Sequence, residues 1–382
     1  MDLTPLAMFA VTFAALLAGY PVAITLAGVA LIFAFVGVIT GAFSPSDFGF
    51  TPGRIFGTIT NQTLIAVPLF VFMGVMLEKT RLAAGLLESM AHLLKNFRGG
   101  LAFTVIFVGM LTAASTGIVG ATVVTMGVMS LPTMLKQGYD PALSTGTIAA
   151  TGTLGQIIPP SISLVLLGDV LSNAYQQAQL NLGIFAPKSI SVSDLFAGAL
   201  VPGLCLVALY LGYIFLRGQF QPGTMPKHHS EQTTPLPIKA LLRDLLPPLL
   251  LILTVLGSII AGWATPTEAA GVGAAGAFVI GLIFQNCNLA QLREVCEATL
   301  KTTAMVFFIL IGASIFSLVF RGYGGDELIQ SWFENMPGGT WGALGVVMLV
   351  IFLLGFILDF IEITFVVVPI VGCHGWNRVC VC

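Results

Sequence analysis

The sequence predicts an all-α protein that crosses a membrane several times. Of its 382 residues, 57% are hydrophobic and only 8% are charged, whereas an ordinary soluble domain has roughly 25% charged residues. The mean hydropathy is +0.98. Apolar runs such as residues 22–36 and 342–358 are too long and unbroken for the alternating strands of a membrane barrel. We therefore expect helices in a lipid bilayer.

The charge balance argues against a nucleic-acid partner. The chain holds 15 Lys and Arg against 17 Asp and Glu, a net charge of -2. No basic stripe is present that could follow a phosphate backbone.

Continuous apolar segments predict the membrane spans in chain order. They are residues 6–19, 22–39, 64–77, 101–114, 195–216, 245–261, 271–284, 303–320 and 342–357. Residues 82–97 instead place Glu88, His92 and Lys95 among apolar residues at helical spacing. That pattern predicts a helix at the membrane surface, and the whole chain accommodates roughly ten crossings.

The polar segment 217–243 predicts a linker between two membrane halves, residues 1–216 and 244–371. Arg217, Lys227, Lys239 and Arg243 lie in it, so the excess of positive charge in cytoplasmic loops places it in the cytoplasm. The Gln- and Asn-rich loop expected at 172–193 should lie on the opposite side, and residues 293–301 should form a second cytoplasmic connection. Similar polar interruptions in the two halves suggest an internal repeat.

The sharpest local signal is residues 147–168, with the sequence TIAATGTLGQIIPPSISLVLLG. Consecutive prolines in a membrane helix remove backbone hydrogen bonds, which must be satisfied by protein or water. We expect a re-entrant helical hairpin that turns within residues 152–160. Freed carbonyls and hydroxyls there would suit Na⁺, and the following helix N-terminus would suit an anion. The alternative is a proline kink needed only for packing.

Two further polar groups interrupt apolar segments. Ser115, Thr116 and Gly117 lie in a cluster of small and hydroxyl residues that could form a second wall of an ion site or simply a tight helix contact. Asp359 and Glu362 are three residues apart, on one helix face, where burying a charge costs at least about 2.5 kcal/mol. They suit cation or proton coupling, or mark a helix end that reaches water.

One polar pair has a structural explanation. Thr265, Pro266 and Glu268 follow the pattern of a helix N-cap, first-turn proline and capping box. We expect them to start a helix.

Signatures of enzymes and ATPases are absent from the sequence. The histidines form no metal-ligand motif, and there is no nucleophile elbow and no phosphate-binding Walker loop. We expect no enzyme activity and no cofactor. Uphill movement of a solute would have to draw on an ion gradient.

The segments TGTLGQIIPPS, GWATPTEAA, ASTGIVGA and LDFIEITFVVVPI together resemble the large membrane subunit of TRAP transporters, the tripartite ATP-independent periplasmic family. The resemblance extends from the first residues to about Val371. It implies a multi-pass subunit in the bacterial inner membrane with an elevator-like fold of the ion-transporter superfamily. It also implies two partners, a small membrane subunit and a periplasmic binding protein, and Na⁺-driven import of an organic anion.

The resemblance also assigns an ion and substrate region. Its residues here are Ser115, Thr116, Gly117, Thr151, Gly152, Thr153, Gly155, Pro159, Pro160, Ser161, Asp359 and Glu362. For Na⁺ itself the implied donors are Ser115, Thr116, Thr153 and Ser161. Relatives continue into a second hairpin, whereas the cysteine-rich segment 372–382 is unlike the rest of this chain. We therefore expect an altered end that removes part of the site.

The predicted function is that of a Na⁺-coupled importer of a small organic anion, with a carboxylate as the expected substrate. A self-sufficient carrier of the same superfamily, working without a binding protein, is one alternative. A membrane scaffold without transport activity is the other.

Overall fold

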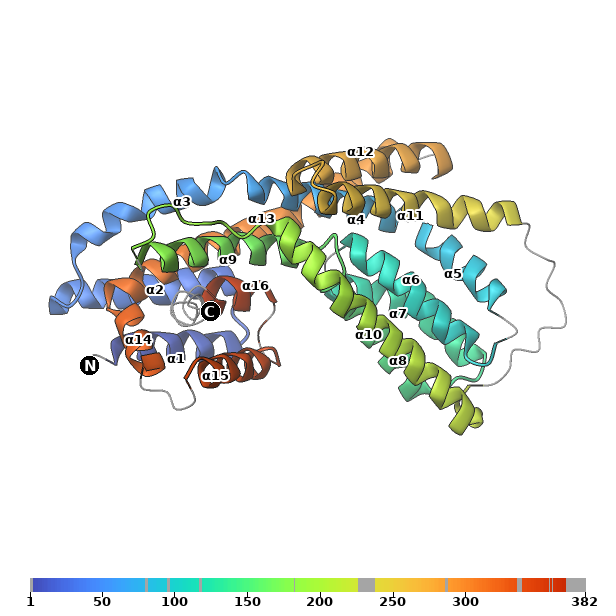
Figure 1. The fold of residues 1–382 in the computed structure, drawn as a ribbon, viewed down its shortest axis with the longest axis horizontal. Coiled ribbons are helices and arrows are strands. Elements are labelled where there is room, and N and C mark those ends of the chain that lie inside the picture. Colours follow the sequence, from blue (N-terminus) through green and yellow to red (C-terminus); the bar gives the residue numbers. More distant parts are fainter. Residues whose placement is uncertain are drawn as a thin grey trace. The chain divides into compact units, whose positions relative to one another are not determined.

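The computed structural model is helical throughout the residues that it describes, which are 3–79, 82–94, 97–116, 119–181, 183–225, 238–285, 288–334, 339–356, 358 and 360–368. Figure 1 shows the helices. Their bounds are α1 (Thr4–Leu17), α2 (Val22–Thr40), α3 (Thr51–Ile59), α4 (Ala66–Lys79), α5 (Leu82–Leu93), α6 (Gly100–Thr116), α7 (Val119–Lys136), α8 (Pro141–Thr153), α9 (Ile162–Asn181), α10 (Val192–Phe220), α11 (Ile238–Ile260), α12 (Pro266–Gln285), α13 (Leu289–Gly322), α14 (Gly325–Glu334), α15 (Gly339–Leu354) and α16 (Phe360–Glu362).

Short helical turns complete the described chain. They are the 3₁₀ turns η1 (Pro45–Phe50), η2 (Thr63–Ile65), η3 (Leu154–Gln156) and η4 (Pro222–Thr224), and the π-helical turn η5 (Ile363–Val367). Among the described residues there is no strand, which confirms the predicted all-α class.

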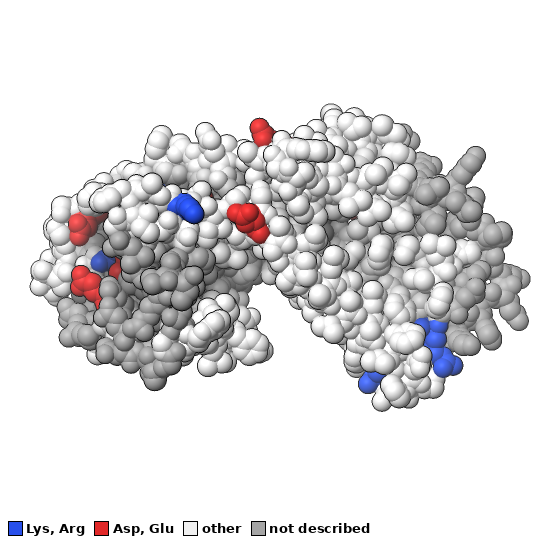
Figure 2. All heavy atoms as spheres, in the orientation of Figure 1, with Lys and Arg blue, Asp and Glu red and all other residues white. Residues whose placement is uncertain are grey.

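Each predicted span falls on a helix, and the helices differ in length. Within the part of the chain that the structure describes, four helices are long and apolar enough to cross a membrane: α2, α10, α12 and α13. The pair η1–α3 and η2–α4 would be a fifth if its 53° bend lies within one span. Figure 2 shows the matching surface, on which charged side chains are few on the face displayed. A surface of this kind suits lipid rather than water.

Some predicted connections are helical instead. The loop expected at 172–193 is helix α9 up to Asn181, and the connection expected at 293–301 lies inside α13. The helical part of the first segment, residues 172–181, is rich in Ala and Gln, and the second contains Glu, Ala, Leu and Lys, all of which favour helix. The start of α13 is also capped, because the amide of Gln291 donates to Asn288 Oδ1 at 2.8 Å and the amide of Asn288 donates to Gln291 Oε1 at 3.2 Å.

The predicted linker is shorter than 217–243. Helix α10 extends to Phe220 and α11 begins at Ile238, so residues 221–237 connect them. Residues 226–237 lie outside the described part of the chain, as does the tail 372–382.

The chain forms two compact units that do not follow the order of the sequence. Unit 1 contains residues 1–62, 166–191 and 302–382, and unit 2 contains residues 63–165 and 192–301. Helices pack by the fit of their apolar faces, so neighbours in a unit need not be neighbours in sequence. The internal repeat expected between the two halves on either side of the linker stays a prediction.

Unit 1 is built on close contacts between α2 and α13. A Cβ at Gly312 would lie 3.2 Å from the carbonyl carbon of Ala23, so only glycine allows this approach. Tyr323 Oη donates a hydrogen bond of 2.6 Å to the carbonyl oxygen of Phe33. Apolar side chains fill the core, among them Phe316 and Phe320, which are fully buried.

Unit 2 holds the helices that position the candidate site. Helix α4 packs against α12 and α6, while α6, α7 and α8 pack against one another. Helices α6 and α7 form an antiparallel pair, because the amide of Leu101 at the start of α6 donates to the hydroxyl of Tyr139, just after α7, at 3.3 Å. Their other ends, Thr116 and Val119, are joined by two residues outside the described part of the chain.

Candidate functional site

Helix α8 stops where the sequence predicts an interruption. It ends at Thr153, the 3₁₀ turn η3 covers Leu154–Gln156, and α9 begins at Ile162. Pro159 and Pro160 have no backbone N–H to donate, and the peptide bond between these two residues is cis. Residues 154–161, which we call the helix break, therefore lie in unit 2 between the end of α8 and the first turn of α9. Whether this segment re-enters the membrane stays a prediction.

Three hydroxyl groups surround the break and bond to backbone carbonyls. Thr151 Oγ1 donates to the oxygen of Thr147 at 2.6 Å, Thr153 Oγ1 donates to that of Ala150 at 2.7 Å, and Ser161 Oγ donates to that of Gln156 at 3.0 Å. A hydroxyl that donates its proton still has lone pairs with which it can accept. Thr151 and Ser161 are fully buried, whereas Thr153 is exposed.

Glycines let the break approach its neighbours at van der Waals distance. A Cβ at Gly155 would lie 2.8 Å from the carbonyl carbon of Ala113 on α6. A Cβ at Gly152 would lie 3.3 Å from the Cα of Val123 on α7. Pro159 and Pro160 are buried beside them. The predicted set Thr151, Gly152, Thr153, Gly155, Pro159, Pro160 and Ser161 is thus brought together in one packed region.

The end of α6 lies against this region. Ala113, which contacts Gly155, precedes the last two helical residues of α6, Ser115 and Thr116, by two positions. Helix α6 is helical through Thr116, and α7 starts at Val119. Gly117 lies outside the described residues.

The second predicted pair belongs to the other compact unit. Glu362 is the last residue of α16 in unit 1 and is buried, with 8% of its surface exposed. The π-helical turn η5 follows it directly. Asp359 lies outside the described residues. The predicted coupling role of this pair stays a prediction.

The structure adds one hydroxyl that the sequence analysis did not single out. Ser163 Oγ, in the first turn of α9, is buried and has no hydrogen-bond partner among the described residues. A buried polar atom without a partner is rare and marks a place where a ligand or water is expected. The sequence signal that could have identified Ser163 is its position, two residues after the predicted site residue Ser161.

Two polar contacts elsewhere were also not expected from sequence. Thr125 Oγ1 on α7 donates to Glu78 Oε1 on α4 at 2.6 Å. Within unit 1, Asn61 Nδ2 donates to Asp169 Oδ1 at 3.0 Å. Both join residues far apart in the chain, so neither has a local sequence pattern.

The capping box predicted at the start of α12 is confirmed. The amide and the hydroxyl of Thr265 both donate to Glu268 Oε2 at 2.8 Å, and the amide of Glu268 donates back to Thr265 Oγ1 at 3.3 Å. The side chains of Thr265 and Glu268 therefore cap the start of α12.

The oxygen atoms at the break are electrically neutral. No Asp, Glu, Lys or Arg occurs between residues 147 and 168, so the donors are neutral hydroxyl and carbonyl oxygens. Such oxygens are ligands for Na⁺, and the amides at the start of α9 present a partial positive charge to an anion.

The chain is similar in sequence to several known membrane transport proteins. The chain is 30% identical over 331 residues to the C4-dicarboxylate TRAP transporter large permease protein DctM of Pseudomonas aeruginosa, covering 86% of this chain and 72% of that protein. It is 28% identical to the protein of that name from Rhodobacter capsulatus, covering 96% and 81%. It is 27% identical to the sialic acid TRAP transporter large permease protein SiaM of Vibrio cholerae, covering 93% and 77%.

A solved structure shares the overall fold. The YdaH transporter of Alcanivorax borkumensis, described as having an unusual topology, superimposes with a TM-score of 0.53 at 14% sequence identity. The superposition covers 87% of this chain and 76% of that one.

The family model for the tripartite ATP-independent periplasmic transporter, DctM component, matches residues 9–374. Together with several apolar helices, this match shows a multi-pass membrane protein of a transporter family. The chain therefore belongs to the DctM family of TRAP transporter large membrane subunits.

Proposed function

We propose that this chain is the large membrane subunit of a Na⁺-coupled, ATP-independent importer of a small organic anion. The proposed partners are a small membrane subunit and a periplasmic binding protein that delivers the anion. The proposed location is the bacterial inner membrane. Family membership supports each of these points, and the observation that carries the proposal is the helix break in unit 2.

The break and the residues beside it carry oxygen atoms of the kind that could coordinate Na⁺, which supports the proposed coupling. Thr153, Ser161 and Ser163 supply hydroxyl oxygens, and the buried Ser163 Oγ lacks a partner among the described residues. A neutral set of oxygens binds a single cation weakly because no fixed negative charge balances it. An anion beside the cation would supply that charge, so ion and substrate would strengthen each other's binding.

We propose a C4-dicarboxylate as the first substrate to test. Two of the relatives named above are C4-dicarboxylate permeases, and the third is a sialic acid permease. All three names describe carboxylates. The helix N-terminus of α9, with Ser163 in its first turn, would face such a group.

The proposal is tested by uptake into proteoliposomes that contain this chain and its small membrane subunit. Radiolabelled succinate and the binding protein are added outside, under an inward Na⁺ gradient. We expect uptake with Na⁺ and none when K⁺ replaces it. Equal uptake in K⁺ would refute Na⁺ coupling, and equal uptake without the binding protein would favour the self-sufficient carrier.

Substitutions at the break test the assignment of its hydroxyls. Thr153→Ala combined with Ser161→Ala should raise the Na⁺ concentration for half-maximal uptake about tenfold, equivalent to about 1.4 kcal/mol of lost binding. An unchanged Na⁺ titration contradicts the assignment.

Matched controls are available on the same helix. Thr145 is exposed like Thr153 and its Oγ1 donates to the carbonyl oxygen of Pro141 at 2.9 Å. Ser144 is fully buried like Ser161 and its Oγ donates to that of Asp140 at 2.9 Å. Replacing both control residues by alanine removes equivalent hydrogen bonds far from the break and should leave the Na⁺ titration unchanged.

A further inference from the structure

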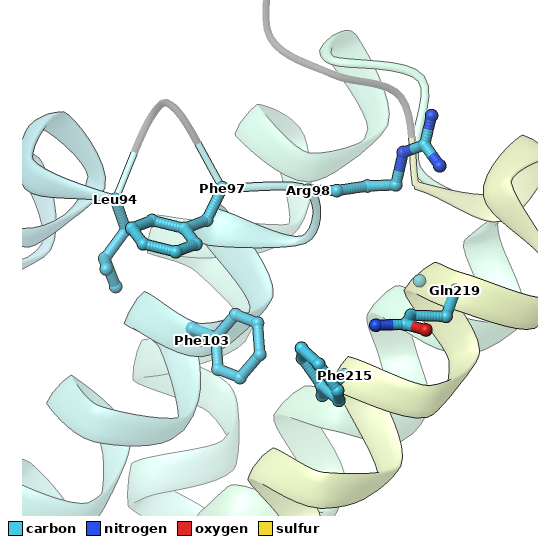
Figure 3. Close-up of a pocket in the computed structure, with 7 residues that line it drawn as sticks. Leu94, Phe97, Arg98, Phe103, Phe215 and Gln219 are labelled. Carbon is cyan, nitrogen blue, oxygen red and sulfur yellow. The ribbon is translucent and has the colours of Figure 1, made fainter.

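A groove outside the transport site lies at the end of unit 2 where α6 begins and α10 ends. Its volume is about 660 Å³. Its lining residues are Leu94, Phe97, Arg98, Phe103, Phe215, Gly218 and Gln219. In Figure 3, Phe97 and Phe103 lie on one side of the groove and Arg98 and Gln219 lie on the other, with Phe215 between Phe103 and Gln219. The groove therefore has an aromatic part and a polar part.

Backbone geometry places the arginine at this groove. Gly99 has a φ of 81°, in the left-handed region that glycine adopts without strain, so the chain turns sharply into α6. A Cβ at Gly218 would lie 3.8 Å from the carbonyl oxygen of Arg98 and 3.9 Å from its Cγ, which is ordinary contact. The stem of Arg98 thus rests over the last turns of α10.

Several basic residues occur at helix ends in this part of unit 2, and Arg98 lines the groove. Arg98, Arg217 in the last turn of α10, and Lys136 in the last turn of α7 form no ion pair with any carboxylate of the described residues. Arg217 Nε is buried and has no hydrogen-bond partner in the described part of the chain. The nearby Asp140 is engaged as the N-cap of α8, accepting from the amide of Leu143 at 2.9 Å.

These cations lie at the same end of unit 2. The hydroxyl of Tyr139 accepts from the amide of Leu101, and the amide of Asp140 donates to the carbonyl oxygen of Thr224 at 3.1 Å. The start of α6, the start of α8 and the turn after α10 therefore meet. The excess of positive charge in cytoplasmic loops assigns this end to the cytoplasmic membrane surface.

The aromatic part needs an apolar environment. Phe97 is 65% exposed and Phe215 is 55% exposed. Water is a poor solvent for such side chains, while lipid acyl chains are a good one. A groove with apolar walls and an arginine that pairs with no carboxylate of the described residues matches a lipid that has acyl chains and a negative headgroup.

We propose that this groove binds an anionic phospholipid from the cytoplasmic leaflet. The phosphate lies beside Arg98, with Gln219 as a further donor, and an acyl chain covers Phe97, Phe103 and Phe215. The inference is independent of the transported substrate, because the groove shares no residue with the helix break.

Native mass spectrometry of the purified full chain tests the proposal. Phosphatidylglycerol and phosphatidylcholine of the same chain length are titrated separately, and bound lipid is counted. We expect preferential binding of phosphatidylglycerol, and Arg98→Gln should weaken it about fivefold, the effect of about 1 kcal/mol for one basic residue near a membrane. Phosphatidylcholine binding should change less.

Lys188→Gln is the matched control, because Lys188 is also exposed and lies in unit 1. It should leave the preference for phosphatidylglycerol unchanged. Phe215→Ser should weaken both lipids, since it removes part of the apolar wall. Equal affinity of the two lipids for the unaltered chain, or equal effects of Arg98→Gln and Lys188→Gln, would overturn the proposal. Soluble glycerol phosphate that displaces phosphatidylglycerol at equal concentration would overturn it too, because acyl chains would then contribute nothing.

Discussion

Adding a single methyl group at Gly155 should separate the helix break from α6. Gly155 lies in η3 and is buried, and its nearest neighbour is the backbone carbonyl of Ala113. In Gly155→Ala the new Cβ would lie 2.8 Å from the carbonyl carbon of Ala113 and 3.0 Å from its Cβ. Real Cβ atoms essentially never approach other atoms more closely than 3.0 Å. Since the obstacle is backbone, it cannot rotate away, and the break or α6 must move.

The expected cost follows from that displacement. Overpacking a well-packed interior by one methyl group costs about 1–3 kcal/mol. For a compact unit of 150–250 residues, each kcal/mol corresponds to roughly 2–4 °C in melting temperature. We therefore expect Gly155→Ala to melt roughly 5 °C lower than the unaltered protein.

The same substitution elsewhere on α8 should have the opposite sign. A Cβ at Gly146 meets nothing within 4 Å. Replacing a helical glycine by alanine in open space stabilises by roughly 0.4–1 kcal/mol, because the unfolded chain loses conformational freedom. Gly146→Ala should therefore raise the melting temperature slightly.

Both variants can be compared by heating the detergent-purified protein and measuring the fraction that remains monodisperse in size-exclusion chromatography. In the reconstituted transporter, Gly155→Ala should also raise the Na⁺ concentration for half-maximal uptake, and Gly146→Ala should not. Equal melting temperatures for the two variants would refute the reasoning, because they would show that the contact with Ala113 is not tight.

Three further predictions concern polar contacts, and the same heating assay measures each. Thr265→Ala removes the hydroxyl that caps α12 and should lower the melting temperature by roughly 2–4 °C, whereas Thr265→Ser should retain it. Thr125→Val leaves the carboxylate of Glu78 without its 2.6 Å donor and should lower the free energy of unfolding by about 1–3 kcal/mol. In a chain that already carries Glu78→Gln, Thr125→Val should cost less. If the effects of the two substitutions simply add, the contact between the two side chains is contradicted. Tyr323→Phe removes the 2.6 Å hydrogen bond to the carbonyl oxygen of Phe33 and should cost about 1 kcal/mol, so an unchanged melting temperature would contradict that bond.

Local patterns predicted much of the helical structure. Consecutive prolines at 159 and 160 predicted the interruption between α8 and α9, because they cannot donate the amide hydrogen bonds that a continuous helix needs. Thr265 and Glu268 predicted the start of α12 because both partners of a capping box lie within four residues. Where polarity alone was used, as for residues 172–193, the prediction missed the helix up to Asn181. Polarity reports solvent exposure, which a helix and a loop can share.

The sequence alone determined the membrane environment, the helical class and the position of the helix break, since these depend on composition and on neighbours along the chain. Only the tertiary structure decided which parts meet: Gly155 with Ala113, Thr125 with Glu78, and the aromatic groove beside Arg98. It also showed that Ser163 Oγ is buried without a partner among the described residues. Such contacts join residues distant in the chain, and their formation depends on how helix surfaces fit together, which no local pattern encodes.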